Sequence, residues 1–133
     1  MNVLFVDDEP ALLQCFVRAL RGEPYGVLTA KSPKEALAIM ETESVDVVVS
    51  DERMPGGSGS AFLTRVRELF PRVIRIMLTG DAGLDGAIRA IQDGKLYRFL
   101  SKPVDNEELL RTLRNAFKMK SVADMSARLR QGT

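Results

Sequence analysis

The hydrophobic pattern alternates between two periods along the chain. Five short runs are rich in β-branched or aromatic residues and are bounded by polar or turn residues, as strands are. They cover residues 3–6, 26–30, 46–50, 73–78 and 97–100. Three of them are nearly continuous apolar runs, which is the pattern of parallel strands covered on both faces. The pattern therefore predicts a parallel sheet packed between two layers.

Segments with helical spacing lie between these runs. Pro10 stands where a first helical turn tolerates proline, and Gly22 ends the helix that follows. The apolar residues expected on one face of this helix are Leu12, Leu13, Phe16, Val17 and Leu20. Ser32 is a predicted N-cap, with Pro33 at the first helical position. Further helices are expected over residues 60–69 and 84–93 and from Asp105 onward.

Five strand–helix units in alternation predict an α/β fold, a doubly wound five-stranded parallel sheet with five helices. At 133 residues the chain has the size of one ordinary domain. We expect that domain to span residues 1–117. Residues 118–133 are expected to form a helical tail or linker, either solvated, dimerising as a coiled segment, or frayed.

Polar residues follow these strands where the fold places ligand sites, outside the carboxyl ends. Asp7 and Asp8 follow the first strand, Asp51 the third and Thr79 the fourth, and Lys102 comes just past the fifth. Carboxylates held close together repel one another unless a cation lies among them or some are protonated. Mg2+ suits a small carboxylate site of this kind. A carboxylate beside Mg2+, a lysine and a hydroxyl predicts a phosphoryl acceptor.

Composition and charge exclude several other classes. Nineteen basic and eighteen acidic residues give a net charge of +1, which does not indicate binding to nucleic acid or to a membrane surface. The chain has no histidine, so histidine triads, histidine zinc ligands and a histidine phosphodonor are excluded. Cys15 is the one cysteine, and we expect it in the core or at its boundary. The apolar runs are short and Met1 leads directly into a strand, which predicts a cytoplasmic protein.

Four blocks of sequence carry a resemblance to a known family. VDDEP (residues 6–10), SDERMPGGSG (50–59), LTG (78–80) and FLSKP (99–103) resemble, in order and spacing, the receiver domain of two-component response regulators. The resemblance covers residues 2–117. It implies a flavodoxin-like sheet with strand order 2-1-3-4-5. It also implies a phosphoacceptor signalling switch, which catalyses only its own phosphorylation and dephosphorylation and is otherwise not an enzyme.

The resemblance implies a role for each residue at the metal and acceptor site. Asp51 would take a phosphoryl group from a partner histidine kinase or histidine phosphotransfer protein. Asp8, Asp51 and the backbone carbonyl of Arg53 would ligate Mg2+, with Asp7 acting mostly through water. A glycine-rich segment, residues 55–59, is expected to form a flexible loop over this site.

The resemblance also implies a switch. Lys102 would contact the phosphoryl group, Thr79 would move toward it, and Phe99 would rotate into the space that Thr79 leaves. The surface of the fourth and fifth strands and helices would then change. An output domain or effector protein would bind this surface, and a homodimer is compatible with it.

Two other classes stay open at this point. A haloacid-dehalogenase-like phosphatase also forms an aspartyl phosphate, but its nucleophile precedes a second aspartate by two residues, whereas Asp7 and Asp8 are adjacent and Asp51 is followed by Glu52 and Arg53. A pseudo-receiver would bind protein partners without phosphorylation. The acidic, hydroxyl and lysine positions are all filled here, which favours a phosphorylated receiver.

Overall fold

A five-stranded parallel sheet forms the centre of the computed structural model, which describes residues 1–80 and 84–131. Its strands are β1 (Asn2–Val6), β2 (Gly26–Ala30), β3 (Val47–Asp51), β6 (Ile74–Thr79) and β7 (Arg98–Ser101). Their order is β2-β1-β3-β6-β7, and every neighbouring pair is parallel. Since β6 and β7 are the fourth and fifth strands of this sheet along the chain, the predicted order 2-1-3-4-5 is confirmed.

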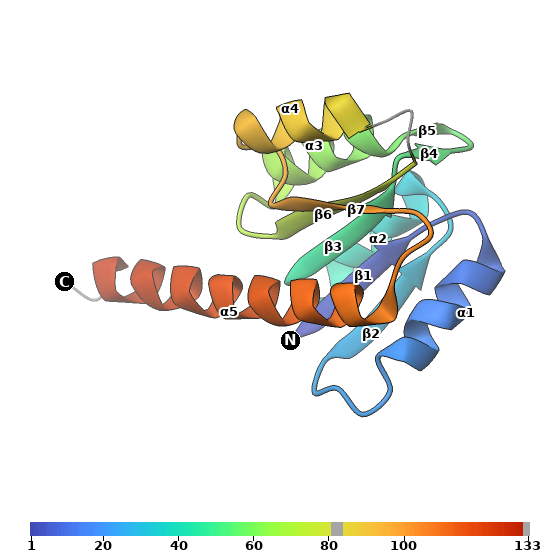
Figure 1. The fold of residues 1–133 in the computed structure, drawn as a ribbon. Helices are drawn as coiled ribbons and strands as arrows, with labels where there is room; N and C mark the ends of the chain where they lie inside the picture. The colour runs from blue at the N-terminus through green and yellow to red at the C-terminus, as the bar shows by residue number, and fades with distance from the viewer. Residues whose placement is uncertain (81–83, 132–133) are drawn as a thin grey trace.

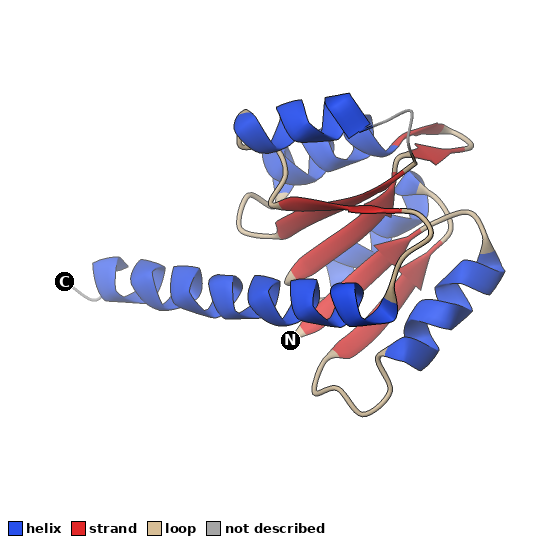
Figure 2. Cartoon of the chain, viewed as in Figure 1, coloured by secondary structure: helices blue, strands red, loops and turns tan. Residues whose placement is uncertain are grey.

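Helices cover both faces of the sheet (Figures 1 and 2). They are α1 (Pro10–Ala19), α2 (Pro33–Thr42), α3 (Gly59–Leu69), α4 (Leu84–Gln92) and α5 (Asn106–Gln131). The helices α1 and α5 pack on one face, and α2, α3 and α4 on the other. The predicted doubly wound α/β class is therefore confirmed, with helix boundaries within two residues of those expected for α2, α3 and α4.

Alternation along the strands divides the core between the two faces. Val3 and Phe5 of β1 belong to the apolar cluster under α1 and α5, whereas Leu4 and Val6 belong to the cluster under α2, α3 and α4. Successive side chains of a strand point to opposite faces, and both faces here are covered. All four of these side chains are completely buried. The continuous apolar runs in the sequence have this origin.

The first helix differs from expectation at two positions. Its buried face consists of Leu13 and Phe16, with Leu20 directly after the helix. Val17 was expected on this face but is 38% exposed, and Cys15 is exposed rather than in the core. A single helix presents a limited stripe to the sheet, and these two residues lie beside that stripe.

Helix starts follow the predicted chemistry. The Ser32 hydroxyl accepts the Glu35 amide hydrogen at 3.1 Å, so Ser32 is the N-cap expected from the sequence. Helix α3 begins one residue earlier than predicted, because Ser58 is its cap and accepts the Ala61 amide hydrogen at 3.0 Å. Helices α2 and α3 are thus fixed at the ends that face the site.

The glycine-rich segment after β3 contains a small hairpin. Strands β4 (Arg53–Met54) and β5 (Gly57–Ser58) pair antiparallel, where the sequence predicted only a flexible loop. Gly56 and Gly57 have φ angles of 89° and 155°, a region that favours glycine, which allows the tight reversal. The turn residues were recognised in the sequence, but two-residue strands are too short to show a periodic pattern.

Helix α5 runs without interruption past residue 117 to Gln131 and extends beyond the sheet (Figure 1). Near its middle, the rings of Phe117 and Tyr25 stack 4.0 Å apart. Buried Lys120 places its Nζ 2.7 Å from Asp124 Oδ1 and 3.8 Å from Asp46 Oδ1, which holds the helix against the start of β3. The division into a domain of residues 1–117 and a tail stays a prediction.

The outer part of α5 exposes Met119, Val122, Met125 and Leu129. None of the helices in the described ranges is both long enough and apolar enough to cross a membrane.

Candidate functional site

The carboxyl ends of β1, β3, β6 and β7 bring the predicted site residues to one edge of the sheet. The strand register pairs Val6 with Ser50, Asp51 with Leu78, and Thr79 with Ser101. Parallel strands end at the same edge, so the residues that follow them meet there. Asp7, Asp8, Asp51, Thr79 and Lys102 all lie in this region, as the sequence predicted.

Three carboxylates gather at this edge. Asp7, Asp8 and Asp51 each offer an oxygen, and these oxygens lie within 4.8 Å of one another. Asp7 and Asp51 are buried, whereas Asp8 is exposed. Mg2+ binds through a few carboxylates and keeps several waters, so a set of oxygen donors that is open to solvent on one side fits this ion. Arg53 follows Asp51 by two residues in the chain and belongs to β4, with an exposed side chain.

Lys102 neutralises part of the negative charge. Its Nζ lies 3.0 Å from Asp51 Oδ1 and 3.4 Å from Asp7 Oδ2, so one ammonium group bridges the ends of β1 and β3. Partial burial acts to lower the pKa of Lys102, but the two carboxylates outweigh it, and the pKa is raised. The lysine is therefore positively charged at any physiological pH.

Asp7 is the most buried of the three acids. Burial raises the pKa of its carboxyl, although the Glu9 amide, which donates to Asp7 Oδ1 at 2.9 Å, and the Lys102 ammonium act in the opposite direction. The nearby Asp51 carboxylate adds to the increase. The ionised form of Asp7 is thus less favourable in the folded protein than in the unfolded chain.

Because ionised Asp7 is unfavourable in the folded protein, Asp7→Asn is expected to stabilise the protein at pH 7 in the presence of EDTA. The folded pKa lies above the ordinary value of 3.8, so ionised Asp7 lowers the free energy of unfolding, and the loss grows as pH rises from 3.8 to the folded pKa. An uncharged asparagine avoids this loss and retains an oxygen for the Glu9 amide. Thermal unfolding across pH 3–8 measures the difference, which should increase with pH and then level off. A variant that is less stable than wild type at pH 7 would contradict the expectation.

Thr79 and Glu52 form a contact that links two strand ends. The Thr79 hydroxyl is buried and lies 3.0 Å from Glu52 Oε2, and it lies equally close to the Gly80 carbonyl oxygen. Glu52 was not among the residues expected at the site. A signal existed, because Glu52 follows Asp51 and Thr79 follows Leu78, and Asp51 and Leu78 are register partners.

Close backbone packing fixes Glu52. Its amide donates to the Leu78 carbonyl at 3.0 Å, and its own carbonyl accepts from the Gly59 amide at 2.7 Å. A Cβ atom on Gly59 would collide with the backbone carbonyl of Asp51, so only glycine allows α3 to begin this close to β3. Glu52, the residue after Asp51, is therefore held between β6 and the start of α3.

Phe99 and Arg53 are the remaining predicted site residues. Phe99 pairs with Met77 across β6 and β7, is half-buried, and packs against the core under α2, α3 and α4. The roles assigned to Phe99 as a switch and to the Arg53 carbonyl as a ligand stay predictions.

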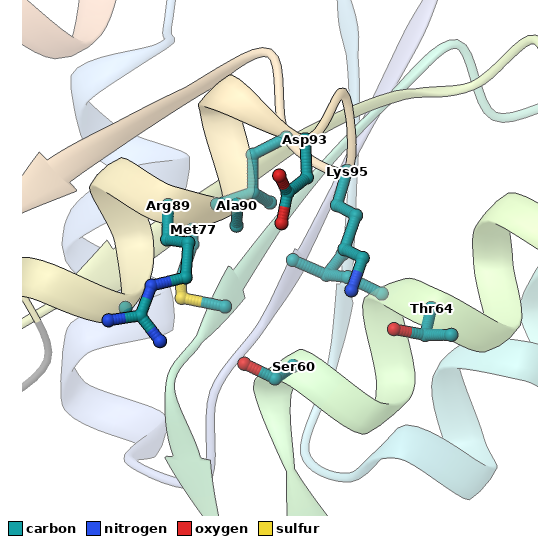
Figure 3. A pocket seen from close by; sticks show the side chains of 10 residues that line it. Ser60, Thr64, Met77, Arg89, Ala90, Asp93 and Lys95 are labelled. Atoms are coloured by element: carbon teal, nitrogen blue, oxygen red, sulfur yellow. The ribbon is translucent and has the colours of Figure 1, made fainter.

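Two hollows are separate from the carboxylate cluster. One, of about 240 Å3, lies between α3 and α4 and is lined by Ser60 and Thr64 on one side and Arg89 and Asp93 on the other (Figure 3). The other, of about 650 Å3, lies between α1 and the segment after β7, and Lys102 forms part of its wall. The second hollow therefore opens beside the charged centre.

Comparison with known proteins identifies relatives that match most of the chain. Residues 3–114 match the family model described as the response regulator receiver domain. The transcriptional regulatory protein GlrR of Escherichia coli is 34% identical over 92% of this chain, which covers 27% of GlrR. The hydrogenase transcriptional regulatory protein HoxA of Cupriavidus necator is 36% identical over 86% of this chain and 24% of its own length. The chain thus spans about a quarter of the length of these curated relatives.

Solved structures match the fold over nearly the whole chain. A structure described as adenylate cyclase from Rhodopirellula baltica superposes with a TM-score of 0.94 at 31% identity, covering 99% of this chain and 98% of that one. A response regulator receiver domain protein from Clostridium thermocellum gives a TM-score of 0.84 at 35% identity, covering 92% of this chain and 98% of that one.

Proposed function

Because this chain belongs to the response regulator receiver domain family, we propose that it is a phosphoacceptor switch in which Asp51 takes a phosphoryl group from a partner protein. The observation that supports this most directly is the position of Lys102, whose ammonium lies 3.0 Å from Asp51 beside two further carboxylates. A partly buried lysine that already contacts the acceptor oxygen is placed to meet the charge that a phosphoryl group brings.

The proposed reaction uses the carboxylate of Asp51 as a nucleophile. One carboxylate oxygen attacks phosphorus, the new O–P bond forms, and the N–P bond of a phosphohistidine donor breaks with its electron pair staying on the imidazole. The chain has no histidine, so the donor histidine belongs to a histidine kinase or phosphotransfer protein. Lys102 remains protonated and neutralises oxygen charge on the transferred group.

Receiver domains use Mg2+, and the three carboxylates supply the oxygen donors that this ion takes. In the proposal Asp8, Asp51 and the Arg53 carbonyl hold the ion, and Asp7 acts mostly through water. The ion supplies charge neutralisation at the phosphoryl oxygens when it is bound. Exposed Asp8 keeps one side of the group open to water and to the donor.

In the proposal, Thr79 and Phe99 link phosphorylation of Asp51 to a change at the protein surface. A phosphoryl group on Asp51 offers new acceptor oxygens, and the Thr79 hydroxyl and the Lys102 ammonium satisfy them together only if Thr79 moves. Phe99 then turns into the space that Thr79 leaves. The surface of α4, β7 and α5 changes, and an output domain or effector binds it, with a homodimer as one form of this output.

The hollow beside Lys102 supports an approach of the donor from the side of α1. Its wall combines apolar Leu12 and Phe16 with Pro103 after β7, and Glu9 and Arg18 add charge. A protein that fills this hollow reaches Lys102 and therefore the neighbouring Asp51. The proposal retains the cytoplasmic location expected from the sequence.

Incubation with acetyl phosphate tests this function without a known kinase. We expect intact-protein mass spectrometry to detect one added phosphoryl group when Mg2+ is present and none when EDTA replaces it. A protein that binds Mg2+, as shown by chemical shift changes at residues 7, 8 and 51, yet gains no mass from acetyl phosphate or from a panel of histidine kinases would refute the proposal and favour the pseudo-receiver. Steady hydrolysis of small phosphomonoesters would instead favour a phosphatase.

A further inference from the structure

Glu52 is a charged residue beside the acceptor whose contact with Thr79 the proposed reaction does not use. We propose that Glu52 is a positioning residue that holds the Thr79 hydroxyl away from Asp51 in the unphosphorylated protein, and so opposes phosphorylation. This inference rests on the proposed function and deepens it, because it assigns to the same site a residue that slows phosphorylation.

The first support is the hydrogen bond itself. The Thr79 hydroxyl has a single proton to donate and lies 3.0 Å from both Glu52 Oε2 and the Gly80 carbonyl oxygen. A carboxylate is the stronger acceptor of the two, since hydrogen bonds to ionised groups are about twice as strong as neutral ones. Thr79 is completely buried, so no solvent competes freely for its proton. Engagement with Glu52 and donation to a phosphoryl oxygen therefore exclude each other.

The second support is that Glu52 is held rigidly. Backbone hydrogen bonds with Leu78 on one side and Gly59 on the other hold the Glu52 backbone in place. The position of the Glu52 Cα atom beside the end of β6 is therefore fixed. Helix α3 can start this close only because Gly59 has no Cβ atom. A side chain on a fixed backbone loses less conformational entropy when it forms a bond than one on a mobile loop.

The third support is that Glu52 has no other assigned task. Among the described residues, the carboxylates close enough to share a metal ion are those of Asp7, Asp8 and Asp51, and Glu52 is outside this group. Within the described ranges, the hydrogen bond of its carboxylate is the one that it accepts from Thr79. A phosphoryl group on Asp51 would add negative charge next to Glu52, so repulsion acts in the same direction as the hydrogen bond.

Two substitutions separate the hydrogen bond from the charge. Glu52→Gln removes the charge and keeps an oxygen that accepts from Thr79, whereas Glu52→Ala removes both. Three-bond couplings from Thr79 Cγ2 to the backbone nitrogen and carbonyl carbon report the side-chain rotamer in the unphosphorylated protein. We expect one rotamer in wild type and in Glu52→Gln, and averaging between rotamers in Glu52→Ala. Wild-type couplings in Glu52→Ala would overturn the inference.

The rate of phosphoryl gain from acetyl phosphate tests the consequence. Because a hydrogen bond to a charged group must break in wild type, Glu52→Ala should gain mass roughly tenfold faster. Glu52→Gln should fall between the two. In a Thr79→Val background, which keeps the shape and removes the hydroxyl, the two Glu52 variants should react at equal rates. If they still differ there, or are equal with Thr79 present, Glu52 does not act through Thr79.

The outcomes separate this inference from the function on which it rests. Failure of wild type to gain a phosphoryl group from acetyl phosphate or from the panel of histidine kinases refutes the proposed function, and the rotamer measurement still decides whether Glu52 holds Thr79. If wild type is phosphorylated and Glu52→Ala is phosphorylated no faster, then Glu52 does not oppose phosphorylation, and the proposed function stays intact.

Discussion

Asp51→Asn is expected to abolish the mass gain from acetyl phosphate and Mg2+. The carboxamide oxygen is a far weaker nucleophile than a carboxylate oxygen. Asp7 also lies beside Lys102, but its side chain is completely buried and not open to a phosphoryl donor. The loss should be complete within the detection limit of the mass measurement.

The fold of this variant should remain intact. Asp51 joins the sheet through its backbone, which pairs with Leu78 of β6 and does not depend on the side chain. Removing one of three neighbouring negative charges also reduces repulsion, so thermal unfolding in EDTA should occur at a temperature no lower than that of wild type. The matched control is Asp93→Asn, an exposed aspartate at the end of α4, which should gain one phosphoryl group like wild type. Mass gain in folded Asp51→Asn would show that another residue is the acceptor.

The sequence was sufficient for the fold because its local signals agree with one another. Strands buried on both faces appear as continuous apolar runs, and the alternation of strands and helices leaves few topologies. The strand order came from the family resemblance. Boundaries moved by one or two residues, as at β3, which starts at Val47 and includes Asp51. The ends of a strand are decided by its backbone hydrogen bonds to neighbouring strands rather than by the type of side chain.

Elements with no periodic signal were missed. The hairpin of β4 and β5 has two residues in each strand, and its glycines look the same in a loop and in a tight reversal. The exposure of Cys15 and Val17 depends on how α1 is rotated against the sheet, which an apolar pattern fixes only approximately.

At the site, the acids, Thr79 and Lys102 could be predicted from the sequence, because parallel strands carry the residues that follow them to one edge of the sheet. The same reasoning did not select Glu52. Its importance comes from a side-chain hydrogen bond between the ends of β3 and β6, and strand register alone does not show whether a side chain reaches its neighbour.

Lys102→Ala is expected to keep Mg2+ binding and to uncouple phosphorylation from the change in the α4, β7 and α5 surface. The oxygen donors of Asp7, Asp8 and Asp51 remain, and the loss of a positive charge 3.0 Å from Asp51 favours a cation at the cluster. The phosphoryl group, however, loses its charged partner. A charge-assisted hydrogen bond contributes about 1.5–3 kcal/mol, so the switch equilibrium should fall back by roughly 10- to 100-fold.

Amide chemical shifts measure both parts of this prediction in one preparation. Titration with Mg2+ should shift residues 7, 8 and 51 in wild type and in the variant. Addition of acetyl phosphate should shift Tyr97 and Phe99 in wild type and much less in the variant at an equal phosphorylated fraction, which mass spectrometry determines. Lys102→Arg is the matched control, because it keeps the positive charge with a different shape and should retain part of the response. Full shifts at Tyr97 and Phe99 in phosphorylated Lys102→Ala would show that the switch does not depend on this lysine, and the contact between phosphoryl group and surface would then have to pass through Thr79 alone.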